Sequence, residues 1–163
     1  TLEIEVNVLP GKGELVLTGK LGDVMKESAR AGISYIRSIS SDYGIDPEFF
    51  TKHDIHVHIP EGAVPKDGPS AGITMALAIL SAVTNRPVRA DIAMTGEITI
   101  RGRVLPIGGL KEKLLAAKNA GMNMVCIPKD NVSDLSEISE EITDGMEILP
   151  INHINQLIKA AFV

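Results

Sequence analysis

Residues 2–8 alternate between aliphatic and polar side chains. This period of two predicts a strand that buries one face. A Pro-Gly-Lys-Gly turn at residues 10–13 follows it, and we expect residues 14–17 to form the returning strand. The chain therefore opens with a predicted β segment.

Helical and strand patterns then take turns along the chain. Asp23 is the predicted N-terminal cap of the first helix, and Gly121 the C-terminal stop of a later one. The polar stretch 129–144 has no assigned element. The predicted helices cover residues 23–39, a segment from the Ser70 loop to about Thr84, 110–120 and 154–162; the predicted strands cover 54–59, 92–94, 98–100, 104–107, 124–127 and 147–149.

This interleaving predicts an α/β or α+β fold. The 163 residues contain no internal repeat, linker or low-complexity segment, so we expect one compact domain over residues 1–163. Because the chain starts at Thr1 rather than at Met, we expect it to be excised from a longer polypeptide.

Composition narrows the class of protein. A hydrophobic fraction of 44% makes disorder unexpected, and a formal net charge of −5 argues against a nucleic-acid surface. No apolar run is long enough to span a bilayer, and no signal peptide is visible. The single cysteine, Cys126, excludes an internal disulfide and fits a reducing compartment. We therefore expect a cytoplasmic domain that contacts neither membrane nor nucleic acid.

The candidate chemistry centres on Ser70. This serine lies in a loop rich in glycine and proline, directly before the apolar run 73–83. The first turn of a helix has free N–H groups and the positive end of the helix dipole, so it can stabilise an oxyanion. A serine hydroxyl needs a base to become a nucleophile, and three kinds of base are available in the chain.

Histidine is the first kind. Residues 68–72 match G-x-S-x-G, the nucleophile elbow of α/β-hydrolases, which needs a histidine downstream. Only His153 lies there, so a small histidine-dependent esterase is one alternative. Upstream, His56 and His58 point to the same side of a predicted strand. A solvated strand face is the plainest interpretation of this pair. Imidazoles also suit zinc, but no Cys, His or Glu cluster completes a metal site.

An N-terminal amine is the second kind of base, with Thr1 as its nucleophile, although nothing around Thr1 resembles a processing site. Lysine is the third. On a helical wheel of residues 110–120, Lys113 falls inside the apolar arc of Leu110, Leu114, Ala117 and Ala120. Either its stem reaches out to water, or its amine is buried with a partner. Burial lowers the pKa of a lysine, and a neutral amine is what a general base requires.

Several motifs together resemble the proteolytic domain of Lon protease. They cover essentially the whole chain, in order and with matching spacing. The motifs are the turn Pro10-Gly11-Lys12-Gly13, His56-Val57-His58-Ile59-Pro60-Glu61-Gly62, Pro65-Lys66-Asp67-Gly68-Pro69-Ser70-Ala71-Gly72, Met94-Thr95-Gly96-Glu97-Ile98-Thr99 and Leu105-Pro106-Ile107-Gly108-Gly109-Leu110-Lys111-Glu112-Lys113.

The resemblance implies a serine endopeptidase with a Ser–Lys dyad, in which Ser70 is the nucleophile and Lys113 the general base. It also implies that the Thr95 hydroxyl orients the Lys113 amine. Asp67 fits a turn, and the resemblance adds that it gates the site or keeps the amine charged.

The same resemblance places His56 and His58 near the active site as supporting residues without a catalytic step. It implies a compact α/β domain of the family's own type, related to a ribosomal-protein-like superfold.

The resemblance also implies cofactors and partners. The chain has no G-x-x-x-x-G-K-[ST] motif, so we expect no cofactor in it, and ATP and Mg on an ATPase module of the parent chain. Members of this family are hexameric rings that degrade unfolded or damaged polypeptides. An assembly module whose Ser70 loop only shapes a ring interface is the non-enzyme alternative.

Overall fold

Two three-stranded sheets form the framework of this computed structural model, which describes residues 3–19, 21–60 and 69–163. The first sheet, in the order β1–β3–β2, contains β1 (Glu5–Pro10), β2 (Leu15–Gly19) and β3 (His53–Ile59). The second, in the order β4–β7–β8, is parallel and contains β4 (Ile92–Met94), β7 (Met124–Pro128) and β8 (Glu147–Ile151). A hairpin pairs β5 (Glu97–Ile98) with β6 (Val104–Leu105).

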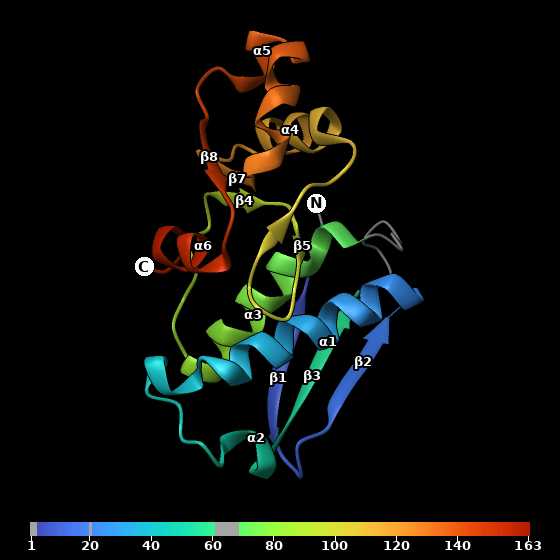
Figure 1. The fold of residues 1–163 in the computed structure, drawn as a ribbon, viewed down its shortest axis with the longest axis vertical. Helices are drawn as coiled ribbons and strands as arrows, with labels where there is room; N and C mark the ends of the chain where they lie inside the picture. The colour runs from blue at the N-terminus through green and yellow to red at the C-terminus, as the bar shows by residue number, and fades with distance from the viewer. Residues whose placement is uncertain (1–2, 20, 61–68) are drawn as a thin grey trace.

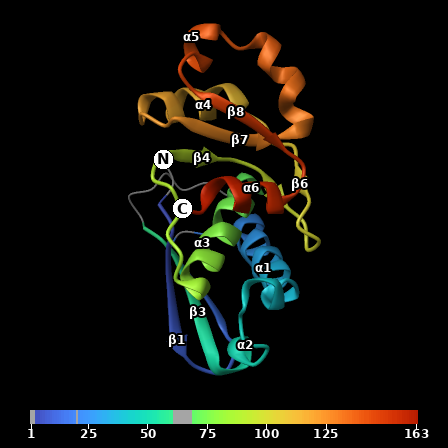
Figure 2. The same cartoon turned by 90° about the vertical axis from the view of Figure 1, so that its left-hand side faces the viewer.

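The helices lie in layers against these sheets. They are α1 (Asp23–Ser38), α2 (Phe49–Lys52), α3 (Gly72–Thr84), α4 (Leu110–Asn119), α5 (Glu140–Thr143) and α6 (Ile154–Ala161), with the short 3₁₀ segments η1 (Ser40–Tyr43), η2 (Pro69–Ala71) and η3 (Lys129–Glu137). Helices α1 and α3 cover one face of the first sheet (Figure 1). The second sheet lies between α6 on one side and α4 on the other (Figure 2). The α/β class is therefore confirmed.

The first sheet differs from the expected hairpin. Strand β2 does return antiparallel to β1, but β3 lies between them, antiparallel to β1 and parallel to β2. Asp54, at the start of β3, stabilises the turn between β1 and β2. Its Oδ1 accepts hydrogen bonds from the backbone N–H groups of Lys12, Gly13 and Glu14 at 2.8–3.1 Å. These bonds lower the pKa of the Asp54 carboxyl, the bond from Glu14 most.

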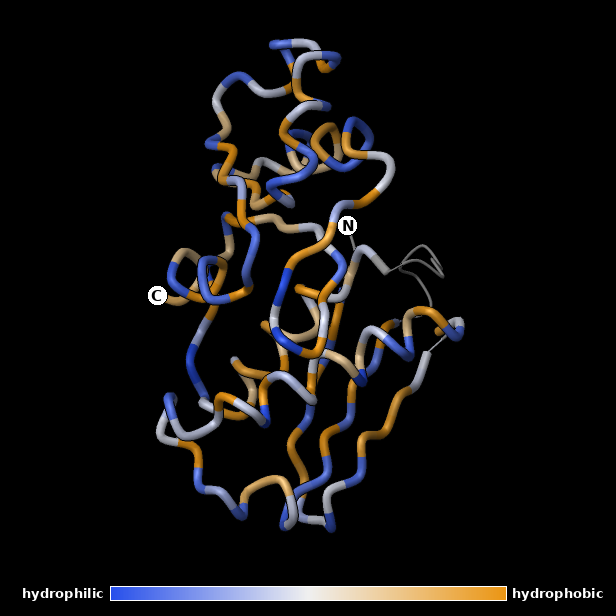
Figure 3. The backbone as a smooth tube through the Cα atoms, in the orientation of Figure 1, coloured by the Kyte–Doolittle hydropathy of each residue, from blue (hydrophilic) through white to orange (hydrophobic). Residues whose placement is uncertain are grey.

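Strand β7 separates two hydrophobic clusters. Its side chains alternate: Met124 and Cys126 join the main core with α3 and α6, whereas Val125 and Ile127 pack with α4. All five residues of β7 are buried, as expected for a central parallel strand. Figure 3 shows hydrophobic residues gathered where α3 lies against the strands, with largely hydrophilic turns at the lower end of the view.

The predicted helices are confirmed to within a few residues, with two corrections. Gly22, not Asp23, is the N-cap of α1; no side chain caps this end, and Asp23 lies in the first turn. Ala120 is exposed, so the buried face of α4 ends at Ala117. Gly32 lies in the middle of α1 because the helix packs closely on α3 there. A Cβ at Gly32 would lie 3.3 Å from that of Ala76.

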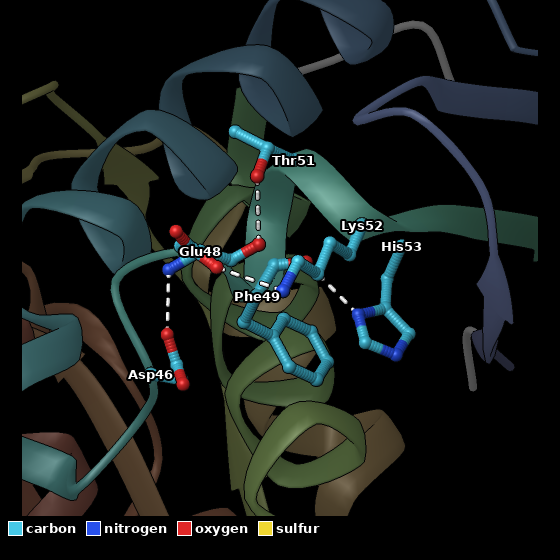
Figure 4. A network of polar contacts seen from close by, with 6 residues as sticks. All are labelled: Asp46, Glu48, Phe49, Thr51, Lys52 and His53. Atoms are coloured by element: carbon cyan, nitrogen blue, oxygen red, sulfur yellow. Dashed lines mark hydrogen bonds and ion pairs between the residues drawn. The ribbon is translucent and has the colours of Figure 1, made fainter.

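Short helical segments were not predicted from the sequence. Helix α2 ends where β3 begins, and local bonds hold this corner (Figure 4). The Glu48 carboxylate pairs with the Lys52 amine at 2.7 Å, and a ring nitrogen of His53 bonds the Phe49 carbonyl at 2.9 Å. The polar stretch 129–144 contains η3 and α5. No helix in the described ranges is long and apolar enough to cross a membrane.

Candidate active site

Ser70 lies in η2, immediately before α3, and is half-buried. Its backbone is fixed to the segment that follows β4. The Gly96 N–H donates to the Ser70 carbonyl at 2.9 Å, and the Ile73 N–H donates to the Gly96 carbonyl at 3.2 Å. Two reciprocal bonds thus tie the start of α3 to the carboxyl end of β4. In parallel sheets this is the edge where sites form.

Glycine makes this close approach possible. A Cβ at Gly72 would lie 2.9 Å from the backbone nitrogen of Ile98, and a Cβ at Gly96 would lie 2.7 Å from Cγ1 of Val104. Both distances are too short for a side chain, and a backbone nitrogen cannot move aside cheaply. Gly72 and Gly96 therefore allow the close packing around Ser70.

Lys113 reaches the same place from the other side of the second sheet. It lies in the first turn of α4, after the N-cap Gly109, whose φ is 72°. Leu110 and Leu114, on its two sides, are 4% and 0% exposed, whereas Lys113 itself is half-buried. Its Nζ donates to the Ser70 Oγ at 3.0 Å. The position of Lys113 on the helix thus brings its amine to the candidate nucleophile.

Asn131 was not singled out from the sequence, yet it fixes the loop before α4. It is 3% exposed, accepts the Ile107 N–H at 2.9 Å and donates to the Ile107 carbonyl at 2.9 Å. A further bond joins its Nδ2 to the Asp134 carboxylate at 2.8 Å. Asn131 is one polar residue among many in residues 129–144, so nothing in the sequence pattern distinguishes it as a buried residue.

Thr95 is 5% exposed, and its hydroxyl lies 3.5 Å from the Ser70 carbonyl oxygen. Its own N–H donates to the Cys126 carbonyl at 3.1 Å, which joins the end of β4 to β7. Thr95 therefore lies beside Ser70, and the expectation that its hydroxyl orients the Lys113 amine stays a prediction. The hydroxyl thus bonds to the backbone of the serine.

The remaining expected residues divide into described and undescribed ones. His56 Nε2 and His58 Nδ1 both lie 2.7 Å from the hydroxyl of Thr18 on β2. Both rings are half-buried on the face of β3 opposite Ile55 and Val57, which confirms that they share one side of the strand. Asp67 and Thr1 lie outside the described residues.

The alternative in which His153 activates Ser70 needs a free ring nitrogen that faces the serine, and His153 is placed differently. His153 caps α6: its Nδ1 accepts the Asn155 N–H at 3.1 Å, and its Nε2 donates to the Arg101 carbonyl at 2.9 Å. Both ring nitrogens are thus engaged with backbone groups. A nucleophile elbow is also a sharp strand-to-helix turn, whereas Ser70 lies within the 3₁₀ segment η2 directly before α3.

Other chemistry has less support in the described residues. Burial raises the pKa of the Cys126 thiol to about 11, which makes this cysteine a packing residue rather than a nucleophile. Among residues 3–19, 21–60 and 69–163, no three His, Cys, Asp or Glu side chains are grouped so that they could hold a metal ion. A hydroxyl beside an amine at 3.0 Å is the arrangement of a nucleophile and a general base. Fold and site together define an α/β domain with a serine–lysine pair at the carboxyl edge of its parallel sheet.

The comparisons with known proteins agree with this class. Residues 1–163 match the family described as Lon protease (S16) C-terminal proteolytic domain, and the chain belongs to that family. It is 66% identical over 163 residues to a Lon protease of Lachnoclostridium phytofermentans, covering 100% of this chain and 20% of that protein. The corresponding identity is 65%, with 100% and 21% covered, for a Lon protease of Clostridioides difficile. For Lon protease 1 of Bacillus subtilis it is 57%, with 100% and 21% covered. The chain spans about a fifth of the length of these relatives.

Proposed function

We propose that this chain is a serine endopeptidase domain in which Ser70 attacks the peptide carbonyl and Lys113 is the general base. The observation that carries the proposal is the 3.0 Å separation between Ser70 Oγ and Lys113 Nζ. This is the distance over which a base can take a proton. Membership of a family of proteolytic domains supports the reaction class.

The reaction proceeds in two halves. Neutral Lys113 takes the Ser70 proton while Oγ bonds to the carbonyl carbon, and the carbonyl electrons move to its oxygen. The tetrahedral intermediate collapses, the C–N bond breaks, and the Lys113 ammonium protonates the departing amine. Water then attacks the acyl-enzyme, with Lys113 again accepting a proton, and releases the acid and Ser70.

The backbone around Ser70 supplies the remaining parts. The Ile73 N–H is already bonded to Gly96, so the N–H groups nearer Ser70 are the proposed oxyanion donors. Thr95, at 3.5 Å from the Ser70 carbonyl, is a positioning residue that holds the serine and the end of β4 together. We assign His56 and His58 no step of the reaction.

The wider setting is also a proposal. We infer that the substrates are unfolded or damaged polypeptides. We also infer that ATP and Mg²⁺ bind to an ATPase module of the same parent chain, and that the parent protein is cytoplasmic. We infer a homo-hexameric ring for the parent protein. The support is the family and the relatives named Lon protease, of which this chain covers about a fifth.

Peptide hydrolysis by matched variants of the 163-residue chain tests the proposal. Ser70→Ala and Lys113→Ala should each lower kcat by about 10⁴-fold or more, because members of a catalytic unit fail together. The control variants are Ser136→Ala and Lys111→Ala, both exposed, and they should retain activity. Circular dichroism checks that each variant folds. Turnover retained in Ser70→Ala or Lys113→Ala would exclude the dyad.

A further inference from the structure

The turn of the β5–β6 hairpin, residues 99–103, is held by the start of α6. Each strand of this hairpin has 2 residues, and so short a hairpin needs contacts from outside to be stable. The turn lies beside the first residues of α6 (Figure 2). There the Ile154 N–H donates to the Gly102 carbonyl at 2.8 Å, and the Val104 N–H donates to the Asn152 carbonyl at 3.0 Å. The position of the hairpin therefore depends on α6.

The His153 side chain adds a further bond at this turn. Its Nε2 donates to the Arg101 carbonyl at 2.9 Å. Its ring meets that of Tyr35 edge-on, with centroids 5.6 Å apart and planes at 74°. Gly102 passes close to both rings: a Cβ there would lie 2.6 Å from Cε1 of Tyr35 and 2.9 Å from Cε1 of His153. Since Nδ1 accepts the Asn155 N–H, the orientation of the imidazole is fixed.

The other end of the hairpin fixes Ser70. Gly96 directly precedes β5, and its N–H donates to the Ser70 carbonyl at 2.9 Å. The backbone of Ile98, in β5, lies so close to Gly72 that no side chain fits at that glycine. Lys113 comes from α4, outside the hairpin, and its Nζ meets the Ser70 Oγ at 3.0 Å. A shift of the hairpin would therefore change this distance, and a displacement of about 1 Å can lower a catalytic rate about a hundredfold.

We propose that His153 is a positioning residue for Ser70. Its bond to the Arg101 carbonyl holds the hairpin, and the hairpin holds Ser70 within reach of the Lys113 amine. This inference rests on the proposed peptidase function. His153 takes no part in proton transfer, because both of its ring nitrogens bond to backbone groups. Its loss should lower kcat rather than raise KM, since it affects the distance within the dyad and not the contacts with the substrate.

Two substitutions separate this positioning from the capping of α6. His153→Gln places an amide nitrogen near the position of Nε2, so it can keep the bond to the Arg101 carbonyl but is a poor cap. His153→Asn places an oxygen near the position of Nδ1, so it keeps the cap and loses that bond. His153→Gln should therefore retain most of the wild-type kcat despite a lower Tm. His153→Asn should keep Tm close to wild type, yet its kcat should fall about tenfold with little change in KM, as in His153→Ala. A purely structural role would make kcat follow Tm.

Amide hydrogen exchange of the 163-residue chain measures the same coupling without catalysis. The Gly96 and Gly102 N–H groups should exchange about fivefold faster in His153→Ala and His153→Asn than in the wild type. In His153→Gln they should keep the wild-type rates. Each rate is taken relative to that of Val57, a buried residue of the central strand β3, so that a change in global stability cancels.

His53 provides the matched control. It is also a half-buried imidazole bonded to a backbone carbonyl, that of Phe49 at 2.9 Å, in the corner between α2 and β3 (Figure 4). His53→Ala and His53→Gln should leave both kcat and the exchange of Gly96 unchanged.

The outcomes distinguish this proposal from the proposed function. A wild type without peptide turnover would end the proposed function, and the exchange of Gly96 would then decide alone whether His153 holds the Ser70 segment. The positioning role is overturned if kcat is unchanged in His153→Ala, or if His153→Gln loses as much kcat as His153→Ala. Exchange of Gly96 at the wild-type rate in folded His153→Ala would overturn it as well.

Discussion

The two sheets contribute to the candidate active site in different ways. Helices α3 and α4 pack on opposite faces of β7 in the parallel sheet β4–β7–β8. Ser70 directly precedes α3 and Lys113 lies on α4, and their side chains meet at 3.0 Å. One face of the mixed sheet β1–β3–β2 packs against α3, and His56 and His58 on its other face bond to Thr18. Packing around the parallel sheet therefore sets the distance within the pair. Packing of the mixed sheet sets mainly the stability of the fold.

Leu114→Ala tests this difference most strongly. Leu114 is fully buried on the inner face of α4, and its truncation should lower the free energy of unfolding by about 2–5 kcal/mol. Because α4 carries Lys113, kcat should also fall at temperatures where the variant is folded. Ile55→Ala, at a 1% exposed position of β3, is the matched change in the mixed sheet. It should cost comparable stability and leave kcat of the folded fraction nearly unchanged. Equal losses of kcat in the two variants would contradict the comparison.

Asn131→Ala sharpens the comparison between the two sheets. The substitution leaves the partly buried N–H and carbonyl groups of Ile107 without the Asn131 side chain as their partner, which should lower the free energy of unfolding by about 1–3 kcal/mol. The loop before α4 then loses its anchor, so we expect kcat to decrease with little change in KM. Asn7→Ala, exposed on β1, is the control. Denaturant unfolding and steady-state kinetics measure both effects, and an unchanged kcat would show that Asn131 serves stability alone.

Asp54→Asn probes the mixed sheet and should have the smallest effect on stability of the substitutions considered. The pKa of this carboxyl is lowered in the folded chain, so its stabilisation is complete above its ordinary pKa of about 4. The stabilisation disappears as the pH falls through the lower pKa of the folded state. Wild type should therefore exceed Asp54→Asn in Tm at pH 7, and the difference should shrink on acidification. An exposed control, Asp144→Asn, should show no such trend, and kcat at pH 7 should stay constant in both.

Sequence patterns predicted local elements well and long-range arrangement less well. The period-two and helical patterns identified the six strands 54–59 to 147–149 and the four long helices to within a few residues. Strand β3 lies between β1 and β2 because it pairs with distant segments on both sides, and Asp54 bonds a turn some 40 residues away. No local pattern encodes these pairings.

In the candidate site, too, local features could be predicted and long-range contacts could not. An apolar arc on a helix singled out Lys113, and its neighbours Leu110 and Leu114 are indeed buried. The arc alone left open whether the amine reaches water, and the resemblance made Lys113 the predicted base. Its 3.0 Å approach to Ser70 spans 43 residues of sequence and arises from packing on two sides of β7. Asn131 was missed because a buried amide and an exposed one look alike in a polar stretch.

The central claim is that Lys113 activates Ser70. Its most direct test is the rate at which a fluorophosphonate probe labels the 163-residue chain, with the modified residue mapped by mass spectrometry. We predict labelling at Ser70 in the wild type and at least a hundredfold slower labelling in Lys113→Met, a loss on the order of that expected for removing a general base. Equal labelling rates in the two proteins, or a wild type that hydrolyses peptide while Ser70 stays unmodified, would contradict the account.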